Sequence, residues 1–277
     1  MTQLVPPPRR VARVAVPVLA LVAATTAAAA PPDVKTIIGR MKQALEPPRS
    51  SLRKMKLTVA QGGSTSEVQV GQARGKAAEG NRILNVALAP ADLRGTAYLV
   101  QEAPESATNK QWAYVPAVGR VRTLISPEAF SAFLNSDFTF SDLGFTPLES
   151  SYKLLGEETT QGAHVYRIEE IPKQNWYYAR ITATVAADSF LPVERRFYDP
   201  ANQLWKIERF EGVATIQGAP TVIRTSMEDV QASSRSTITI TDLQYDAQIP
   251  PELLDPLAMP NAAKSPAWTS LNAPVGH

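Results

Sequence analysis

The chain of 277 residues contains no cysteine and only two histidines. The absence of cysteine excludes disulfides, thiol chemistry and cysteine-based metal sites. It also excludes a lipoprotein, which needs a cysteine at its processing site. A Ser-His-Asp triad would depend on His164, because His277 is the terminal residue, and no nucleophile-elbow sequence accompanies either one. Residues 71–80 are rich in glycine but lack the spacing of a phosphate-binding loop. We therefore expect no cofactor and no enzymatic activity, and we interpret His164 as structural.

An excess of positive charge is also absent once the first residues are set aside. Arg9, Arg10 and Arg13 are the only charged residues before Asp33, and without these three the 28 basic residues fall to 25, against 26 acidic residues. A nucleic-acid-binding protein normally has a basic patch or stripe, so we expect no nucleic-acid partner. With 44% hydrophobic and 19% charged residues, the composition is typical of a globular protein.

The first thirty residues have the pattern of a secretory signal. The three arginines precede an uncharged run over residues 14–24, and small residues follow over 27–30. We expect cleavage after Ala28 or Ala29. An uncleaved membrane anchor is the less favoured alternative, because the uncharged run is short for a bilayer-spanning helix. The sequence thus predicts a signal peptide over residues 1–29 and a mature protein that is periplasmic.

Period-two alternation of apolar and polar residues dominates the mature chain. Met55 and Leu57, for example, alternate with Lys54 and Lys56, and each such run is bounded by turn-forming residues. Alternation of this kind indicates an antiparallel sheet with one covered face, and a large twisted sheet must curl. We predict a mainly β fold, an incomplete barrel of about eleven strands, whose inner face is filled by helices, side chains or a ligand.

Two further segments have their own patterns. Residues 33–45 have apolar residues at spacings of three and four, which predicts an amphipathic helix capped by Asp33. Residues 259–277 are rich in proline, alanine, asparagine and serine, and we expect them to be disordered. The predicted organisation is therefore a signal peptide, a single domain over residues 30–258 and a disordered tail.

The stretch over residues 110–143 is the candidate functional site. Two short strands around residues 112–115 and 121–125 precede a loop that is unusually apolar, since loops normally carry few large apolar groups. We interpret this loop as a segment that folds over a hydrophobic groove. The candidate ligand-binding residues are Trp112, Tyr114, Phe130, Phe133, Leu134, Phe138 and Phe140.

Four charged residues accompany the apolar loop. We expect Arg120 and Arg122 to form salt bridges with Asp137 and Asp142 and so to set the closed position of a lid. The alternative, that Asp137 and Asp142 are a catalytic acid pair in a hydrolase, is weaker. If the loop is a lid, serine at Phe133 and Phe138 should weaken binding of an apolar ligand while folding survives; if binding and folding are lost together, these residues are ordinary core.

Several pieces of the chain, taken in order, resemble the LolA-like outer-membrane lipoprotein-sorting protein family in its larger variant. They are RGTAYLV from Arg94, WAYVPAVGRVRTL from Trp112, SDFTFSDL from Ser136, YKLLGEE from Tyr152, VYRIEEIPK from Val165, LPVERRFYDPANQLWK from Leu191 and TITITDLQYDAQIPPELL from Thr237. Two departures stand out: Asn135 replaces the glycine usual before Ser136, and Leu254 stands where the family tends to carry phenylalanine.

The resemblance implies a curled antiparallel sheet whose concave side is covered by a few helices. It also implies a carrier that binds acyl chains of lipoproteins or other lipids, taking them from an inner-membrane transporter to an outer-membrane acceptor without covalent chemistry. A non-transporting periplasmic subunit that docks on an inner-membrane exporter, through a sheet edge or the aromatic loop, remains the alternative.

Overall fold

The computed structural model describes residues 1–2, 32–77, 80–102, 109–125, 128, 130–144, 150–160, 162–173 and 177–275. Apart from Met1 and Thr2, the predicted signal peptide lies outside these residues. Pro32–His277 forms one compact unit, which is described here by itself. Within the described ranges, no helix is both long enough and apolar enough to cross a membrane.

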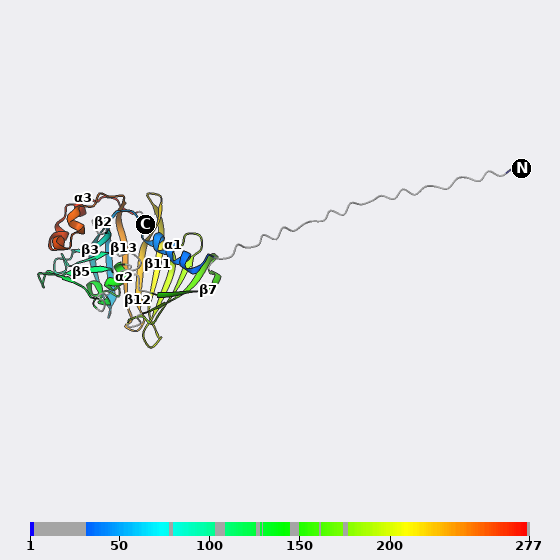
Figure 1. Ribbon diagram of the computed structural model, residues 1–277, viewed down its shortest axis with the longest axis horizontal. Helices are drawn as coiled ribbons and strands as arrows, with labels where there is room; N and C mark the ends of the chain where they lie inside the picture. Colours follow the sequence, from blue (N-terminus) through cyan, green and yellow to red (C-terminus); the bar gives the residue numbers. More distant parts are fainter. Residues whose placement is uncertain are drawn as a thin grey trace. The chain divides into compact units, whose positions relative to one another are not determined.

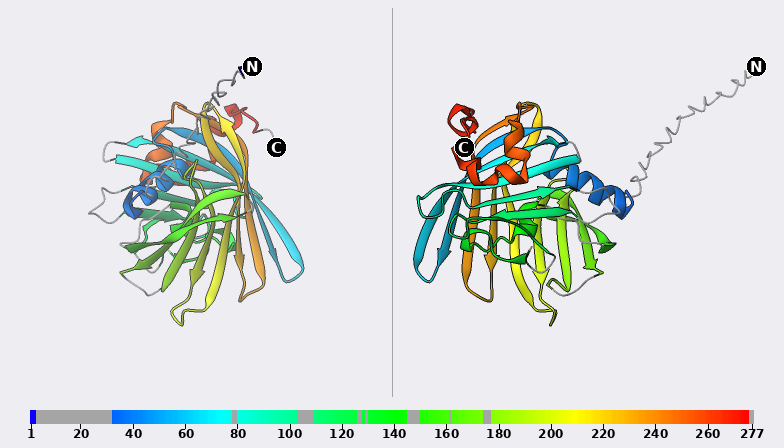
Figure 2. Two further views of the ribbon diagram at one scale, coloured as in Figure 1. Left: turned by 90° about the vertical axis from the view of Figure 1, so that its right-hand side faces the viewer. Right: turned by 60° about the vertical axis from the view of Figure 1, so that its left-hand side comes forward.

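A single antiparallel sheet forms most of this unit, and its strands curl around an inner face (Figure 2). Its thirteen strands within the described ranges are β1 (Ser51–Gln61), β2 (Ser64–Ala77), β3 (Gly80–Ala89), β4 (Ala97–Gln101), β5 (Lys110–Tyr114), β6 (Val121–Thr123), β7 (Ser150–Thr160), β8 (Ala163–Pro172), β9 (Arg180–Ala186), β10 (Pro192–Tyr198), β11 (Leu204–Ile216), β12 (Ala219–Asp229) and β13 (Ser234–Tyr245). The mainly β, curled architecture is confirmed. The expected count of about eleven was too low, because strands of three to five residues carry too few alternations to be counted reliably.

The strand order explains how the sheet stays open. It runs β6-β5-β4-β3-β2-β1-β13-β12-β11-β10-β9-β8-β7, so two meanders meet where β1 pairs with β13. The edge strands β6 and β7 are consecutive in the chain. Residues 130–144, which lie between them in the chain, pack on the inner face of the sheet.

The predicted alternation is present in the strands. Met55, Leu57 and Val59 of β1 are buried on the inner face, whereas Lys56 between them is exposed. On β4, Tyr98 belongs to the inner apolar cluster and its neighbour Leu99 to a second cluster on the opposite, outer face. Both faces of β2 to β4 are thus covered, which is why these strands contain nearly continuous buried residues.

Helix α1 (Val34–Leu45) lies beside the half of the sheet that contains β7 and β11, as Figure 1 shows. The predicted cap is confirmed, since the Asp33 carboxylate accepts hydrogen bonds from the Thr36 amide at 3.0 Å and the Thr36 hydroxyl at 2.6 Å. The apolar stripe of α1 packs on β8 and β9, in a cluster that includes Ile37, Met41 and Ile168. The β9 residues in this cluster, Ala183 and Val185, point to the same face of the strand as Ile181, which belongs to the inner cluster. Helix α1 therefore covers the inner face.

The C-terminal residues are ordered up to residue 275, so the prediction of a disordered tail is wrong there. They form the 3-10 helices η3 (Pro251–Leu254) and η4 (Pro256–Lys264) and the short helix α3 (Ala267–Ser270), which lies beside β2 and β3 (Figure 1). We call residues 251–275 the C-terminal strap. Its composition suits short proline-rich turns, while Met259, Trp268 and Leu271 bury against the outer face.

Candidate functional site

A pocket opens on the inner face, between the sheet and the segment that joins β6 to β7. Its volume is about 80 Å³ for the centres of water-sized spheres. That is room for several water molecules, but it is well below the roughly 300–1,000 Å³ of sites that hold drug-sized ligands. The residues that line it are Leu45, Glu46, Arg53, Met55, Gln72, Phe138, Asp142, Leu143, Glu208, Phe210, Val222, Ile223, Thr225, Ile238 and Ile240.

The cover of this pocket is formed by residues 130–144, which we call the inner segment. It contains the 3-10 turn η2 (Phe133–Asn135) and the short helix α2 (Phe140–Gly144). Leu134 and Asn135 both have left-handed backbone angles, with φ of 52° and 59°. A glycine adopts such angles without strain and asparagine tolerates them better than most residues, which explains how Asn135 replaces the glycine usual at this position.

The five apolar residues predicted on this segment do come together. Phe130, Phe133, Leu134 and Phe138 are buried in the inner cluster, and half-buried Phe140 packs against it. The Phe140 ring lies 4.9 Å from that of Tyr98 and 5.7 Å from that of Phe133, measured between centroids. Phe138 lines the pocket, whereas Phe133 packs away from it. Their role in ligand binding stays a prediction.

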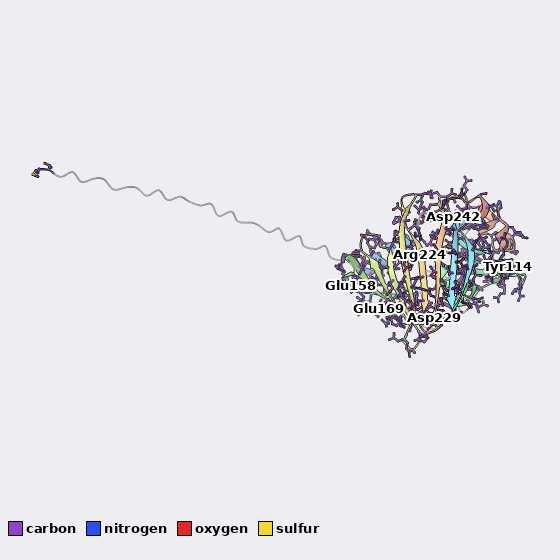
Figure 3. The ribbon with its side chains drawn as sticks, turned by 180° about the vertical axis from the view of Figure 1, so that it is seen from behind. Tyr114, Glu158, Glu169, Arg224, Asp229 and Asp242 are labelled. Carbon is purple, nitrogen blue, oxygen red and sulfur yellow. The ribbon has the colours of Figure 1, made fainter. Side chains whose placement is uncertain are left out.

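Trp112 and Tyr114 lie elsewhere, so their grouping with the phenylalanines was wrong. Both pack against the outer cluster beneath the C-terminal strap, and Ala113 between them faces the inner cluster. Figure 3 shows Tyr114 toward one side of the sheet and Glu158 of β7 toward the other. Alternation correctly put Trp112 and Tyr114 on one face, but it does not say which face that is.

The predicted salt bridges are absent from the described residues. Arg122 pairs with Glu128, with 3.5 Å between nitrogen and oxygen, and Arg120 is exposed. The carboxylate of Asp137 instead accepts hydrogen bonds from the hydroxyls of two β13 serines, Ser234 at 2.5 Å and Ser236 at 2.6 Å. These bonds fasten the inner segment to the middle of the sheet.

Asp142 is held within the inner segment itself. Its carboxylate accepts hydrogen bonds from the Thr139 amide at 2.7 Å and hydroxyl at 2.8 Å, while the Asp142 amide donates to the Thr139 hydroxyl at 3.2 Å. This reciprocal pair is a capping box at the start of α2. Asp137 and Asp142 therefore have separate structural partners. Among the described residues, no group of three or more His, Cys, Asp or Glu is placed to hold a metal ion.

A charged network at one end of the pocket was missed by the sequence analysis. Glu46, just after α1, contacts Arg53 of β1 at 3.1 Å and Arg74 of β2 at 3.0 Å, and Arg74 also contacts Glu102 at 2.9 Å. The arginine side chains are only 8% exposed. The sequence did hold a signal, because Arg53 and Arg74 occupy inward positions in the alternation of otherwise apolar strands.

A second buried pair, Arg195 of β10 and Glu208 of β11, lies 2.6 Å apart beside the pocket. Burial raises the pKa of Glu208, and the nearby Arg195 guanidinium opposes only part of that effect. Burial alone would lower the pKa of Arg195, but the carboxylates of Glu208, Asp142 and Glu170 together outweigh burial and raise that pKa. Burial likewise raises the pKa of Tyr178, with a further contribution from Asp142. Glu208 and Tyr178 are 4% and 3% exposed, so this end of the inner face has little contact with water.

Comparison with known proteins places this geometry in a family. A family model described as an uncharacterized protein matches residues 79–261, more than half of the chain. No curated protein matches. Among solved structures, a DUF1329 family protein from Desulfovibrio piger is 26% identical, with a TM-score of 0.74 over 81% of this chain and 96% of its own.

Two further solved structures share the fold at lower identity. A putative outer membrane lipoprotein-sorting protein domain from Vibrio parahaemolyticus is 20% identical, with a TM-score of 0.73 over 81% of this chain and 97% of its own. A LolA superfamily protein from Nitrosomonas europaea is 18% identical, with a TM-score of 0.64 over 80% and 96%. The chain therefore belongs to the family of uncharacterized proteins whose model spans residues 79–261, and its fold is that of the LolA-like, outer-membrane lipoprotein-sorting proteins that its sequence resembles.

Proposed function

We propose that this protein is a periplasmic carrier that binds acyl chains of lipids or lipoproteins on its inner face and moves them toward the outer membrane, without covalent catalysis. The observation that carries this proposal is the largely apolar pocket on the inner face of a LolA-like sheet, which is covered by the aromatic side chains of the inner segment. The cargo comes from an inner-membrane transporter and passes to an outer-membrane acceptor.

The size of the pocket indicates how such a carrier regulates its affinity. Each buried methylene contributes about 0.8 kcal/mol, so even part of an acyl chain provides useful binding energy. A pocket of about 80 Å³ leaves little room for such a chain unless the inner segment moves. Entry of the ligand then breaks packing contacts that hold the segment closed, such as those of Phe133, while Phe138 on the pocket wall contacts the ligand. Because the broken contacts offset part of the binding energy, net affinity stays modest and the cargo can be released.

A second candidate function is the docking subunit on an inner-membrane exporter. Val115, Val118 and Ile125 are 37%, 50% and 66% exposed around the β5–β6 hairpin, at an edge of the sheet. Exposed apolar residues beside an open edge are typical of protein–protein contacts. In this alternative the hairpin binds a partner protein and the inner face stays closed.

Extraction of a fluorescent acyl lipid from vesicles tests both functions. The wild type should take up the lipid, and Phe138→Ser should weaken uptake by about ten- to hundredfold, because burial of a phenylalanine side chain contributes about 1.5–3 kcal/mol. Val118→Ser is the matched control, since it also replaces a large apolar residue by serine but lies at the exposed hairpin. A wild type that extracts no lipid, or a loss caused by Val118→Ser alone, contradicts the carrier.

A further inference from the structure

A row of polar side chains lies among the apolar residues of the inner face on β1, β2 and β3. Arg53 of β1 lies directly opposite Gln72 of β2, and Gln72 lies directly opposite Asn85 of β3. The three residues are 6%, 6% and 0% exposed. We call them the polar row. Their neighbours along the strands, such as Met55 and Ile83, belong to the inner apolar cluster.

The polar row has unmet hydrogen-bonding capacity. The Gln72 amide nitrogen donates to the Asn85 amide oxygen at 2.9 Å. Within the described part of the chain, however, Arg53 Nε, Gln72 Oε1 and Asn85 Nδ2 have no hydrogen-bond partner. Buried polar atoms are nearly always paired, because an unmade bond costs free energy without return. Two donors and one acceptor on neighbouring strands therefore indicate that something else completes these bonds.

The position of the row identifies what that is. Arg53 and Gln72 line the inner pocket, and the rest of its wall includes Met55, Phe138 and Ile240. A molecule in the pocket meets apolar side chains over most of the wall, and polar or charged ones at Arg53, Gln72, Glu46, Asp142 and Glu208. This division suits an amphiphile, with hydrocarbon against the apolar wall and a polar group at the row.

The local charge indicates a neutral polar group. The Arg53 guanidinium is already bound to Glu46, and that of Arg74 is shared between Glu46 and Glu102. Two arginines and two glutamates balance, so this network leaves no net positive charge for an anionic headgroup. A buried phosphate or carboxylate would be left without a compensating charge, which is costly at low exposure.

We propose that the polar row binds the neutral ester or amide linkage that joins an acyl chain to its headgroup, as in acylglycerols and acylated lipoproteins. Arg53 Nε donates to a carbonyl oxygen of the linkage, and Gln72 Oε1 accepts a hydrogen bond from an N–H or O–H group of the ligand. Asn85 does not line the pocket and instead holds the Gln72 side chain in place through the hydrogen bond between them. This inference rests on the proposed acyl carrier and adds the chemical class that the same site selects.

The test compares three probes on delipidated, full-length mature protein by displacement of a fluorescent hydrocarbon. The probes are monopalmitoylglycerol as the neutral ester, palmitate as the anion, and hexadecane as the chain alone. The wild type should prefer the ester over hexadecane. The double variant Gln72→Met, Asn85→Leu should reduce that preference by about 5- to 30-fold, the loss expected for one to two hydrogen bonds.

The double variant removes both partners of one hydrogen bond and replaces them by apolar groups of similar size, so folding should survive. Ser226→Ala is the matched control, because Ser226 Oγ is also buried without a partner among the described residues. Its neighbour Thr225 lines the pocket, so Ser226 faces the opposite side of the strand, away from the pocket. This control should keep the full preference for the ester.

The outcomes are distinguishable. A preference lost in the double variant and kept in Ser226→Ala supports the proposal. If hexadecane and ester bind but the double variant keeps the preference, ordered water satisfies the row and the inference is overturned, while the acyl carrier stands. Tighter binding of palmitate than of the ester by the wild type also overturns it. If the wild type binds neither the fluorescent hydrocarbon nor any probe, the acyl carrier itself fails.

Discussion

Replacing Phe133 by alanine distinguishes a movable inner segment from a fixed core. The Phe133 side chain is 1% exposed and packs away from the pocket, so its loss removes contacts that hold the segment closed. Truncation of a buried phenylalanine to alanine costs about 3–5 kcal/mol. Where that cost appears depends on whether the segment opens separately from the sheet.

If the segment opens separately, the cost falls on its local closing equilibrium. Amide hydrogen exchange over residues 133–144 should then accelerate by about 10²- to 10⁴-fold, because each 1.36 kcal/mol is a factor of ten. The melting temperature should change little. Affinity for an acyl ligand should rise, contrary to the expectation from the sequence alone, because Phe133 does not line the pocket and the ligand no longer has to displace a well-packed segment.

Phe197→Ala is the control, because Phe197 is 2% exposed on β10, within the sheet itself. For a unit of this size, 1 kcal/mol shifts the melting temperature by about 2–4 °C, so this variant should melt roughly 6–20 °C lower. The movable-segment reasoning is refuted if Phe133→Ala melts as low as Phe197→Ala and loses acyl affinity. In that case the inner segment is ordinary core.

Two other substitutions test the packing and the buried charge. A Cβ at Gly71 would lie 2.9 Å from the Trp268 ring, so Gly71→Ala should destabilise the protein by about 1–3 kcal/mol and expose Trp268 to solvent. The control is Gly39→Ala in helix α1, where a Cβ would meet no atom within 4 Å, so this variant should stabilise the protein by up to about 1 kcal/mol. Urea unfolding followed by tryptophan fluorescence measures both. Arg195→Met should raise the pKa of Glu208 further, because burial is then opposed only by the more weakly acting Lys206. A carboxyl group whose folded-state pKa is raised contributes stability at low pH, and this stability is lost as the pH rises through that pKa. The free energy of unfolding should therefore fall more steeply with pH in Arg195→Met than in the wild type. An unchanged slope contradicts this.

Local patterns in the sequence were enough to predict helix α1, its Asp33 cap and the inward positions of β1. Each depends on residues a few positions apart, where spacing alone determines which side chains share a face. The concentration of phenylalanines on the inner segment was predicted for the same reason. The curl of the sheet followed from its size and twist.

Long-range partners were beyond the reach of this reasoning. Asp137 binds Ser234 and Ser236, which are 97 and 99 residues away, and nothing in the local pattern indicates that β13 lies beneath the inner segment. The burial of Trp112 on the outer face depends on the C-terminal strap, whose composition suggested disorder. The inward arginine Arg53 was visible in the alternation, but its carboxylate partner lies on a different element.

The most direct test of the carrier is to identify what the protein holds when it is made in a periplasm. The full chain, with its N-terminal residues, is expressed, purified from the periplasmic fraction without detergent, and extracted with organic solvent for mass spectrometry. The account predicts an acylated species, near one per protein, with an ester or amide linkage. A protein that is empty after this purification, and that also refuses added acyl lipids, contradicts the account and favours the docking subunit.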